Sequence, residues 1–255
     1  MLDAMQVPPI EFVAVTCSYL VVAKPAGIPT VPLAGEPRRT TLLSLAASRY
    51  PEILQGAGKL AHEGLVLHRL DTATSGLVLI ARSADSYGSL LQSQSSGQFV
   101  KRYVAAVSHV SPAAGFPPFT CDPDRDRRLV IRSGFRPYGE GRKSVRPVTG
   151  DSPARAAGKG TSRQYQTVAE EAFDRAGRAL RICTISAGFR HQIRCHLAWS
   201  SFPIVGDALY GGAPDELLHL ACTEIRFPDP ITNEQVLVRW QAPFDWATAT
   251  SEDAL

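Results

Sequence analysis

Short runs of hydrophobic residues, separated by turn-forming residues, recur along the chain and predict β-strands. Four such runs, rich in Val, Leu, Ile and Ala and too short for typical helices, occupy residues 19–24, 65–71, 76–82 and 99–107. The turn-forming sequence KPAG ends the first run, and only TATS separates the second run from the third. The second and third runs are therefore expected to form two strands around a tight connection.

Capping residues mark two segments that we expect to be helical. Thr40 precedes LLSLAASRY (42–50), and Ser83 begins the segment at 83–95. A hydroxyl side chain at such a position accepts a hydrogen bond from an N–H of the first helical turn that has no other partner. Gly97 follows the second segment and predicts its end, because glycine adopts the left-handed conformation at low cost.

Regular structure is predicted again in the second half of the chain. Regular elements are expected at 163–170 and 179–186, followed by a helix at 189–200 in which Ile193 and Leu197 share one face. Strands mixed with helices, without regular alternation, predict an α+β fold rather than a doubly wound sheet.

One domain is expected to account for most of the chain. Its predicted bounds are 19–246, with an N-terminal extension at 1–18 and a C-terminal tail at 247–255. The Pro-, Gly- and Arg-rich stretch at 111–160 is the least regular part, and we interpret residues 112–162 as a basic, loop-rich insertion with little core of its own.

Composition narrows the class of protein. The chain has 255 residues, of which 44% are hydrophobic and 20% charged, as in ordinary globular proteins. No apolar stretch approaches the roughly 18 residues that a membrane helix needs, and the N-terminus lacks the pattern of a secretory signal. Five scattered cysteines without a CxxC pair argue against a disulfide framework and structural zinc. We therefore expect a cytoplasmic monomer without a metal, a membrane contact or an obligate protein partner.

The basic charge is concentrated in one stretch. From Asp124 to Arg163, nine Arg and two Lys stand against four acidic residues, which gives a local net charge of +7 in a chain whose total is +3. Such a stretch is typical of a surface that binds a phosphate backbone. An Arg-rich solvated loop explains the same pattern equally well.

The most informative segment is HRLDTATSGLVLIAR, in which Asp71 stands between two hydrophobic runs and Arg69 lies two residues before it. A carboxylate in such a place is costly unless it is paired or hydrogen-bonded. The local spacing by itself favours a simpler interpretation, an Asp that caps the TATS turn.

Three other segments favour a catalytic role for Asp71. Arg194 is a cation that can keep a buried carboxylate ionised. Tyr103, beside the cation Lys101, offers an aromatic face for stacking a base. The Gly-containing loop KPAGIP (24–29) is of a kind that approaches ligands closely. Each feature has a simpler interpretation: Arg194 as a charge on a helix surface, Tyr103 as a core side chain, and KPAGIP as an ordinary turn. The inference therefore depends on their combination.

In their order along the chain, these motifs resemble the RluA-type family of RNA pseudouridine synthases, from about Tyr19 to Pro243. A single motif of this kind has little specificity, whereas all of them in this order are highly specific. The matching elements are KPAG, HRLDTATSG, the KxY pair of Lys101 and Tyr103, HQIRCH, the element with Pro203, Gly206, Asp207 and Tyr210, and LLHLACTEIRFPDP.

The resemblance implies roles for particular residues. Asp71 is expected to be the catalytic carboxylate, Tyr103 to stack on the target base, and Arg194 to pair with Asp71. Arg69 is expected to fill the space that an extruded base leaves. No metal ligands are expected, since the histidines near the motifs lack partners at metal spacing. The residues expected to contact substrate are Lys24, Arg69, Lys101, Arg190, His191, Ile193 and Leu220.

The implied activity is the isomerisation of specific uridines in structured ribosomal or transfer RNA to pseudouridine, without any cofactor. The base must first be flipped out of the RNA, at a cost of roughly a few kcal/mol. A carboxylate suits the later steps as nucleophile or base at a sugar centre, and the sequence leaves both open. The implied fold is the pseudouridine synthase catalytic fold, a mixed, largely antiparallel sheet flanked by helices and loops.

The chain departs from the family pattern in two places. Phe189 stands where the family commonly has Arg, and Arg190 beside it is expected to substitute. The basic stretch before Arg163 exceeds what a minimal catalytic domain needs, and no S4-type RNA-binding domain is expected before Tyr19. We therefore expect the stretch to contact RNA, and its residues chosen for a test are Arg125, Arg127 and Arg128.

Other functions fit part of the pattern. A glycosidase-like nucleoside hydrolase would use Asp71 as nucleophile, but it needs a second carboxylate that no motif nominates. A non-catalytic RNA-binding protein that retains the fold would not require Asp71, Tyr103 and Arg194 together. A basic scaffold protein would leave HRLDTATSG unexplained.

Overall fold

The computed structural model describes residues 9–33, 36, 39–56, 58, 60–112, 115–119, 127–150, 152, 158, 160–173 and 177–244. These residues form a ten-stranded sheet with the order β1-β2-β3-β9-β4-β8-β7-β5-β6, in which β10 also pairs with β9. The strands are β1 (Glu11–Val15), β2 (Tyr19–Lys24), β3 (Ser75–Ala81), β4 (Val100–Ala106), β5 (Arg128–Tyr138), β6 (Ser144–Val148), β7 (Tyr165–Phe173), β8 (Ala179–Ile185), β9 (Leu220–Pro228) and β10 (Gln235–Arg239). The helices are α1 (Leu42–Ala47), α2 (Ala84–Ser95) and α4 (Gln192–Trp199), with 3₁₀ turns η1 (Pro51–Leu54), η2 (Ala61–Glu63) and η3 (Glu140–Arg142).

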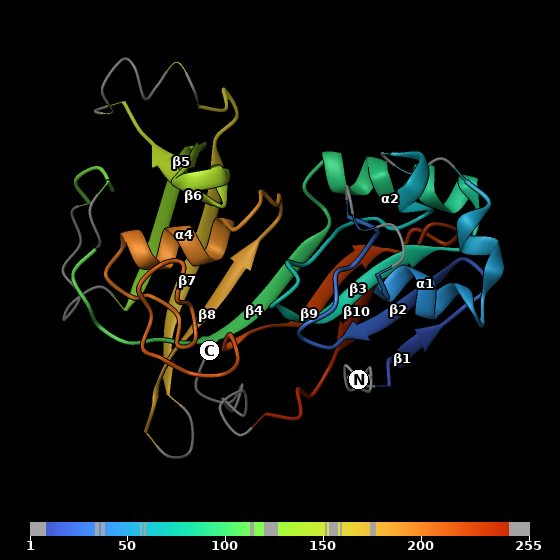
Figure 1. Ribbon diagram of the computed structural model, residues 1–255. Helices are drawn as coiled ribbons and strands as arrows, with labels where there is room; N and C mark the ends of the chain where they lie inside the picture. Colours follow the sequence, from blue (N-terminus) through green and yellow to red (C-terminus); the bar gives the residue numbers. More distant parts are fainter. Residues whose placement is uncertain are drawn as a thin grey trace.

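The sheet has two halves that meet at β4 (Figure 1). Helix α2 packs on β3 and β9 in one half, and α4 packs on β6 and β7 in the other. Every strand pair is antiparallel except β3 with β9. The expected α+β fold with a mixed, largely antiparallel sheet is therefore confirmed. No described helix is long and apolar enough to cross a membrane.

The parallel contact between β3 and β9 is short and depends on a glycine. Ser75 lies opposite Ala221, and Gly76 lies opposite Cys222. Gly76 has a φ of +114°, and a Cβ at this position would collide with the backbone of Cys222. Only glycine allows the two strands to approach this closely. This contact fixes the chain a few residues after Asp71.

Most of the short elements lie where the sequence predicts them. Strands β2, β3 and β4 occupy the expected runs. Ser83 caps α2 by accepting a hydrogen bond from the N–H of Ser86 at 3.2 Å, and Gly97 ends the helix with a φ of +80°. The cap of α1 is Thr41 rather than Thr40, because Thr41 and Ser44 satisfy each other's backbone N–H groups.

The strand predicted at 65–71 is wrong beyond its first residues. Val66 forms a single bridge with Ile80, and the chain then leaves the sheet. Side chains take over the hydrogen bonds of the missing strand: the Nε2 of His68 accepts from the N–H of Leu79 at 3.2 Å. The segment that carries Asp71 is thus an irregular connection, as its turn-like spacing allowed.

The loop prediction for 111–160 is also wrong in part, because the stretch contains β5 and β6. Strand β5 pairs with β7 from Arg128 to Ser133. Its side chains alternate between exposed and buried over the sequence RLVIRS, so Arg128 and Arg132 point to solvent while Leu129 and Ile131 enter the core. Two of the arginines that suggested a loop, Arg128 and Arg132, thus lie on the solvent face of a strand.

The chain ends also differ from expectation where they are described. Residues Glu11–Val15 of the predicted N-terminal extension form β1, which pairs with β2. The predicted tail at 247–255 lies outside the described residues.

Candidate active site

A cleft of about 780 Å³ lies between the segment that carries Asp71 and the start of α4. Its walls come from the two halves of the sheet, so residues far apart in sequence face one another. Nearly all of the candidate residues from the sequence line this cleft: Arg69, Asp71, Lys101, Tyr103, Arg190, His191, Ile193, Arg194 and Leu220.

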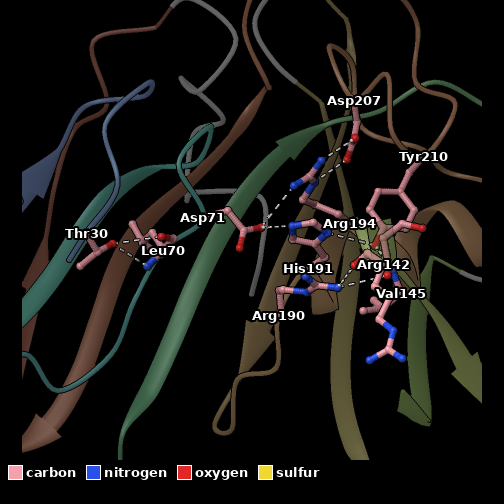
Figure 2. A network of polar contacts seen from close by, with 11 residues as sticks. Thr30, Leu70, Asp71, Arg142, Val145, Arg190, His191, Arg194, Asp207 and Tyr210 are labelled. Atoms are coloured by element: carbon pink, nitrogen blue, oxygen red, sulfur yellow. Dashed lines mark hydrogen bonds and ion pairs between the residues drawn. The ribbon is translucent and has the colours of Figure 1, made fainter. Parts of the chain in front are cut away.

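The backbone on both sides of Asp71 is held by the loop after β2. The hydroxyl of Thr30 donates to the carbonyl of Leu70 and accepts from its N–H, both at 3.0 Å (Figure 2). On the other side, the carbonyl of Thr72 accepts from Lys24 Nζ at 3.2 Å. A short irregular segment has few hydrogen bonds of its own, so these contacts determine where the Asp71 carboxylate points.

Lys24 does not line the cleft, and the expectation that it contacts substrate is corrected. Its side chain is fully buried, and Nζ also donates to the carbonyls of Pro25 and Ile28, both at 2.8 Å. Burial lowers the pKa of Lys24 to about 7, against the opposing effect of the Asp71 charge. Lys24 therefore acts on the site by positioning the Asp71 segment.

Arg194 stands between two carboxylates. Its Nε and Nη2 donate to Asp207 at 2.7 and 2.8 Å, and its Nη1 lies 3.4 Å from Asp71 Oδ2 (Figure 2). Burial opposes the Arg194 charge, but hydrogen bonds to Asp207 and the charges of both carboxylates raise the Arg194 pKa above its ordinary value. The guanidinium is thus permanently charged, bound bidentately to Asp207 and more loosely to Asp71.

Asp207 had no role in the sequence-based prediction beyond its place in a motif. Its carboxylate is completely buried, and its backbone carbonyl accepts from the N–H groups of Tyr210 and Gly212 in a tight turn. A Cβ at Gly206 or Gly212 would collide with neighbouring backbone, so the turn requires both glycines. The glycines on either side of Asp207 were the available sequence signal of a tightly packed turn.

His191 is the second group that faces Asp71. Its Nε2 lies 3.8 Å from Asp71 Oδ2, and its Nδ1 lies 3.2 Å from the hydroxyl of Tyr210, which accepts from the N–H of Val145 at 3.0 Å. Burial lowers the pKa of His191, and the charges of Arg194 and Arg190 add to this effect while that of Asp71 opposes it. At neutral pH the ring is therefore uncharged, and Arg194 is the cation beside Asp71.

Helix α4 is held in place by a buried histidine. The ring of His196 contacts Thr167 Oγ1 on β7 at 2.8 Å and Ser133 Oγ on β5 at 3.0 Å. Burial lowers the His196 pKa to about 3, so the ring stays neutral. The stretch that was expected to be a loop thus supplies the strand on which the helix of Arg194 rests.

Tyr103 and Lys101 project from the same face of β4 into the cleft, and both are nearly buried. Burial raises the pKa of Tyr103 well above its usual value, so its phenol is neutral. The Nζ of Lys101 lies 5.3 Å from the ring centre of Phe99. An aromatic face on the wall of a cleft suits a planar ligand.

The remaining candidates lie at the rim. Arg69 is mostly exposed and pairs with the buried carboxylate of Glu63 at 2.8 Å. Arg190 donates to backbone carbonyls of the β5–β6 connection rather than to a carboxylate. Phe189, in place of the commoner Arg, stacks on Phe135 at 5.0 Å with parallel rings and so joins the core under α4.

The geometry brings the Asp71 carboxylate, a permanently charged guanidinium and a neutral aromatic face into one cleft. Such a carboxylate can act as a nucleophile or a base toward a ligand lying on the aromatic ring.

Comparison with known proteins agrees with this geometry. Residues 18–199 match the family described as RNA pseudouridylate synthase. The chain is 33% identical over 196 residues to ribosomal large subunit pseudouridine synthase D of Xanthomonas campestris, covering 76% of this chain and 49% of that protein. It is 28% identical over 197 residues to the tRNA pseudouridine(31) synthase of Saccharomyces cerevisiae, covering 76% and 44% respectively. The chain thus spans about half the length of these two relatives.

A solved structure, human RNA Pseudouridylate Synthase Domain Containing 1, shares the fold. It aligns with a TM-score of 0.65 at 21% identity, covering 93% of this chain and 85% of that one.

Proposed function

Since the chain belongs to the RNA pseudouridylate synthase family, we propose that it isomerises specific uridines in structured ribosomal or transfer RNA to pseudouridine. The match confirms the family that the motif order indicated. The observation that carries the proposed activity is the Asp71 carboxylate, 3.4 Å from Arg194, in the same cleft as the face of Tyr103. Relatives named for ribosomal and transfer RNA support both substrate classes.

The reaction moves one bond and one hydrogen. The bond between N1 of uracil and C1′ of the sugar breaks, the base turns, and C5 joins C1′. The hydrogen leaves C5, and N1 gains one, so no oxidant or reductant is needed. In this proposal Asp71 acts by one of two routes. As a nucleophile it bonds to C1′ while N1 leaves, and C5 then displaces it; as a base it takes the hydrogen from C2′ while N1 leaves, and returns that hydrogen to C2′ when C5 bonds to C1′. Arg194 places a permanent positive charge 3.4 Å from Asp71 in both cases.

Positioning of the base falls to the walls of the cleft. Tyr103 stacks on the uracil while it turns, and Ile193 and Leu220 pack beside it; Lys101 and His191 complete the polar contacts. The cleft admits a single base only after extrusion from the RNA, so base flipping is part of the proposal. Arg69, largely exposed at the rim, then occupies the vacated space.

We propose that the protein acts as a monomer in the cytoplasm, with no cofactor. Both walls of the cleft come from the same chain. Four described cysteines are free thiols, as expected in a reducing compartment: Cys17, Cys183, Cys195 and Cys222.

Tritium release from RNA labelled at uracil C5 tests the activity. The wild-type protein is expected to release tritium, and Asp71→Asn is expected to release none while keeping its unfolding midpoint. Asp85→Asn is the matched control, because Asp85 is an exposed carboxylate in the first turn of α2 and should leave release unchanged. Full release by Asp71→Asn would refute the assignment. Free uracil as product would indicate a hydrolase, and binding without release would indicate an RNA-binding protein.

A further inference from the structure

The basic stretch divides into two parts with different surroundings. At the start of β5, Arg127 and Arg128 face acidic residues of β7: Arg127 Nε lies 3.8 Å from Glu171, and Arg128 Nε lies 3.4 Å from Glu170. Such exposed pairs contribute little to stability, but they cancel most of the local charge. This part of the stretch therefore presents little net positive potential to a ligand.

The connection between β5 and β6 is different. Arg142 and Lys143 are both exposed, and neither contacts a carboxylate within the described part of the chain. Glu140 is the one acidic residue in the sequence from 127 to 150, against seven basic ones. We call Arg142 and Lys143 the tip cations.

The tip cations are fastened to the rim of the cleft. Arg190, which lines the cleft, donates through Nη2 to the carbonyl of Arg142 at 2.7 Å and to that of Ser144 at 3.2 Å (Figure 2). The next residue, His191, lies 3.8 Å from Asp71. A continuous path of contacts thus runs from the Asp71 carboxylate to the tip, and Arg163 is a further exposed cation on the cleft wall.

The backbone at the tip is held in an uncommon conformation. Arg142 has a φ of +55°, in the left-handed region that glycine favours. A long side chain there costs about 1–3 kcal/mol and persists only where surrounding contacts impose it. The hydrogen bond from Arg190 is such a contact.

Given the proposed action on RNA, we propose that Arg142 and Lys143, with Arg163 and Arg190 beside them, bind phosphates of the RNA backbone next to the target uridine. The partner is a phosphodiester chain, because these four cations are exposed, form no salt bridge with a carboxylate of the described residues, and lie on or beside the cleft wall. Contacts of this kind position the substrate without reading its sequence. The inference moves the RNA contact away from Arg127 and Arg128, where the sequence had placed it; Arg125 lies outside the described residues.

RNA affinity at several salt concentrations tests the surface. Arg142→Gly/Lys143→Gln removes the tip cations, and glycine suits the left-handed φ, so the fold is not strained. Each lost phosphate contact should reduce the slope of log affinity against log salt by about 0.7–0.9, so a reduction of about 1.4–1.8 is expected. Affinity at low salt should fall on the order of tenfold. Arg127→Gln/Arg128→Gln removes the same charge from β5 and is expected to change neither quantity.

The proposed phosphate-binding surface would be refuted if both double variants lost the same RNA affinity. It would also be refuted if Arg142→Gly/Lys143→Gln lost none. Tritium release by the wild-type protein distinguishes failure of this surface from failure of the proposed function. Affinity that depends on the tip cations, without tritium release, refutes the enzyme and leaves the RNA surface in place. Tritium release with no dependence on the tip cations refutes the surface alone.

Discussion

Replacing Asp207 by asparagine tests whether this buried carboxylate holds the guanidinium that faces Asp71. Asparagine keeps one acceptor but sets an NH₂ group against an N–H of Arg194, so one of the two hydrogen bonds at 2.7 and 2.8 Å is lost. The negative charge is lost as well. The side chains of Arg194 and Asp207 are 10% and 0% exposed, so the cation is left without its main partner in a poorly hydrated place.

The expected loss of stability follows from that burial. Removing one partner of a buried ion pair costs about 3–5 kcal/mol, because the other charge remains uncompensated. Equilibrium unfolding in urea should therefore show a loss of this size for Asp207→Asn. Glu52→Gln breaks the partly exposed pair with Arg82 and should cost about 1 kcal/mol or less.

Catalysis should respond through Arg194 alone. Asp207 is fully buried behind the guanidinium, so its replacement should leave KM for RNA within about twofold. The value of kcat should fall on the order of 10²-fold, because Arg194 is no longer held at 3.4 Å from Asp71. Steady-state tritium release at saturating RNA measures both quantities.

A double-mutant cycle tests whether Asp207 acts on the site through Arg194. Arg194→Met leaves Asp207 as a buried unpaired anion, so adding Asp207→Asn to it should restore stability rather than reduce it further. The coupling free energy should be at least about 2 kcal/mol. Additive losses of stability and of kcat would refute the view that Asp207 acts on the site through Arg194.

Further predictions concern the supports of the site. Thr30→Val removes both hydrogen bonds to Leu70, so it should lower kcat and reduce the free energy of unfolding in urea by about 1–3 kcal/mol. Thr30→Ser keeps the hydroxyl and should leave kcat and stability unchanged. Equal behaviour of the two variants would contradict the role of the hydroxyl. The His196 ring is protonated below pH 6.5 in the unfolded chain, but only below a pKa of about 3 in the folded protein. The free energy of unfolding should therefore fall as the pH is lowered from 6.5 to 3, and His196→Gln should lose this pH dependence. Parallel curves of stability against pH for the wild type and the variant would contradict the prediction. Tyr103→Phe should keep RNA affinity because it retains the aromatic face, and Tyr103→Leu should weaken it by about 1–3 kcal/mol in a binding titration; equal affinities would exclude stacking.

The sequence predicted most of its candidate residues of the cleft and the ends of α2 correctly, because reactive side chains in ordered motifs and local helix signals reveal them. Asp71, Tyr103 and Arg194 lie far apart in the chain, and the structure places all three on the walls of one cleft. Ser83 and Gly97 bound α2 as expected because their effects are local. Such features depend on a few neighbouring residues, which a single sequence contains.

Errors arose where distant contacts decide the outcome. The segment at 65–71 has the composition of a strand, but two hydrogen bonds between Thr30 and Leu70 and one from Leu79 to His68 replace the ladder. Strand β5 was hidden because arginines occupy its solvent face, although Leu129 and Ile131 kept the alternation. Lys24 was expected at the substrate because nothing local reveals that three carbonyls enclose its ammonium.

The position of β9 in the sheet has a consequence for biosynthesis. Strand β9, residues Leu220–Pro228, lies between β3 and β4 and so links β3 to the strand at which the two halves meet. It follows both Asp71 and Arg194 in the sequence, so an emerging chain holds these two residues before it holds β9. The contact between these residues spans 123 positions of sequence and belongs to a late stage of folding. The sheet that holds the two walls of the cleft is therefore complete only after β9 has left the ribosome.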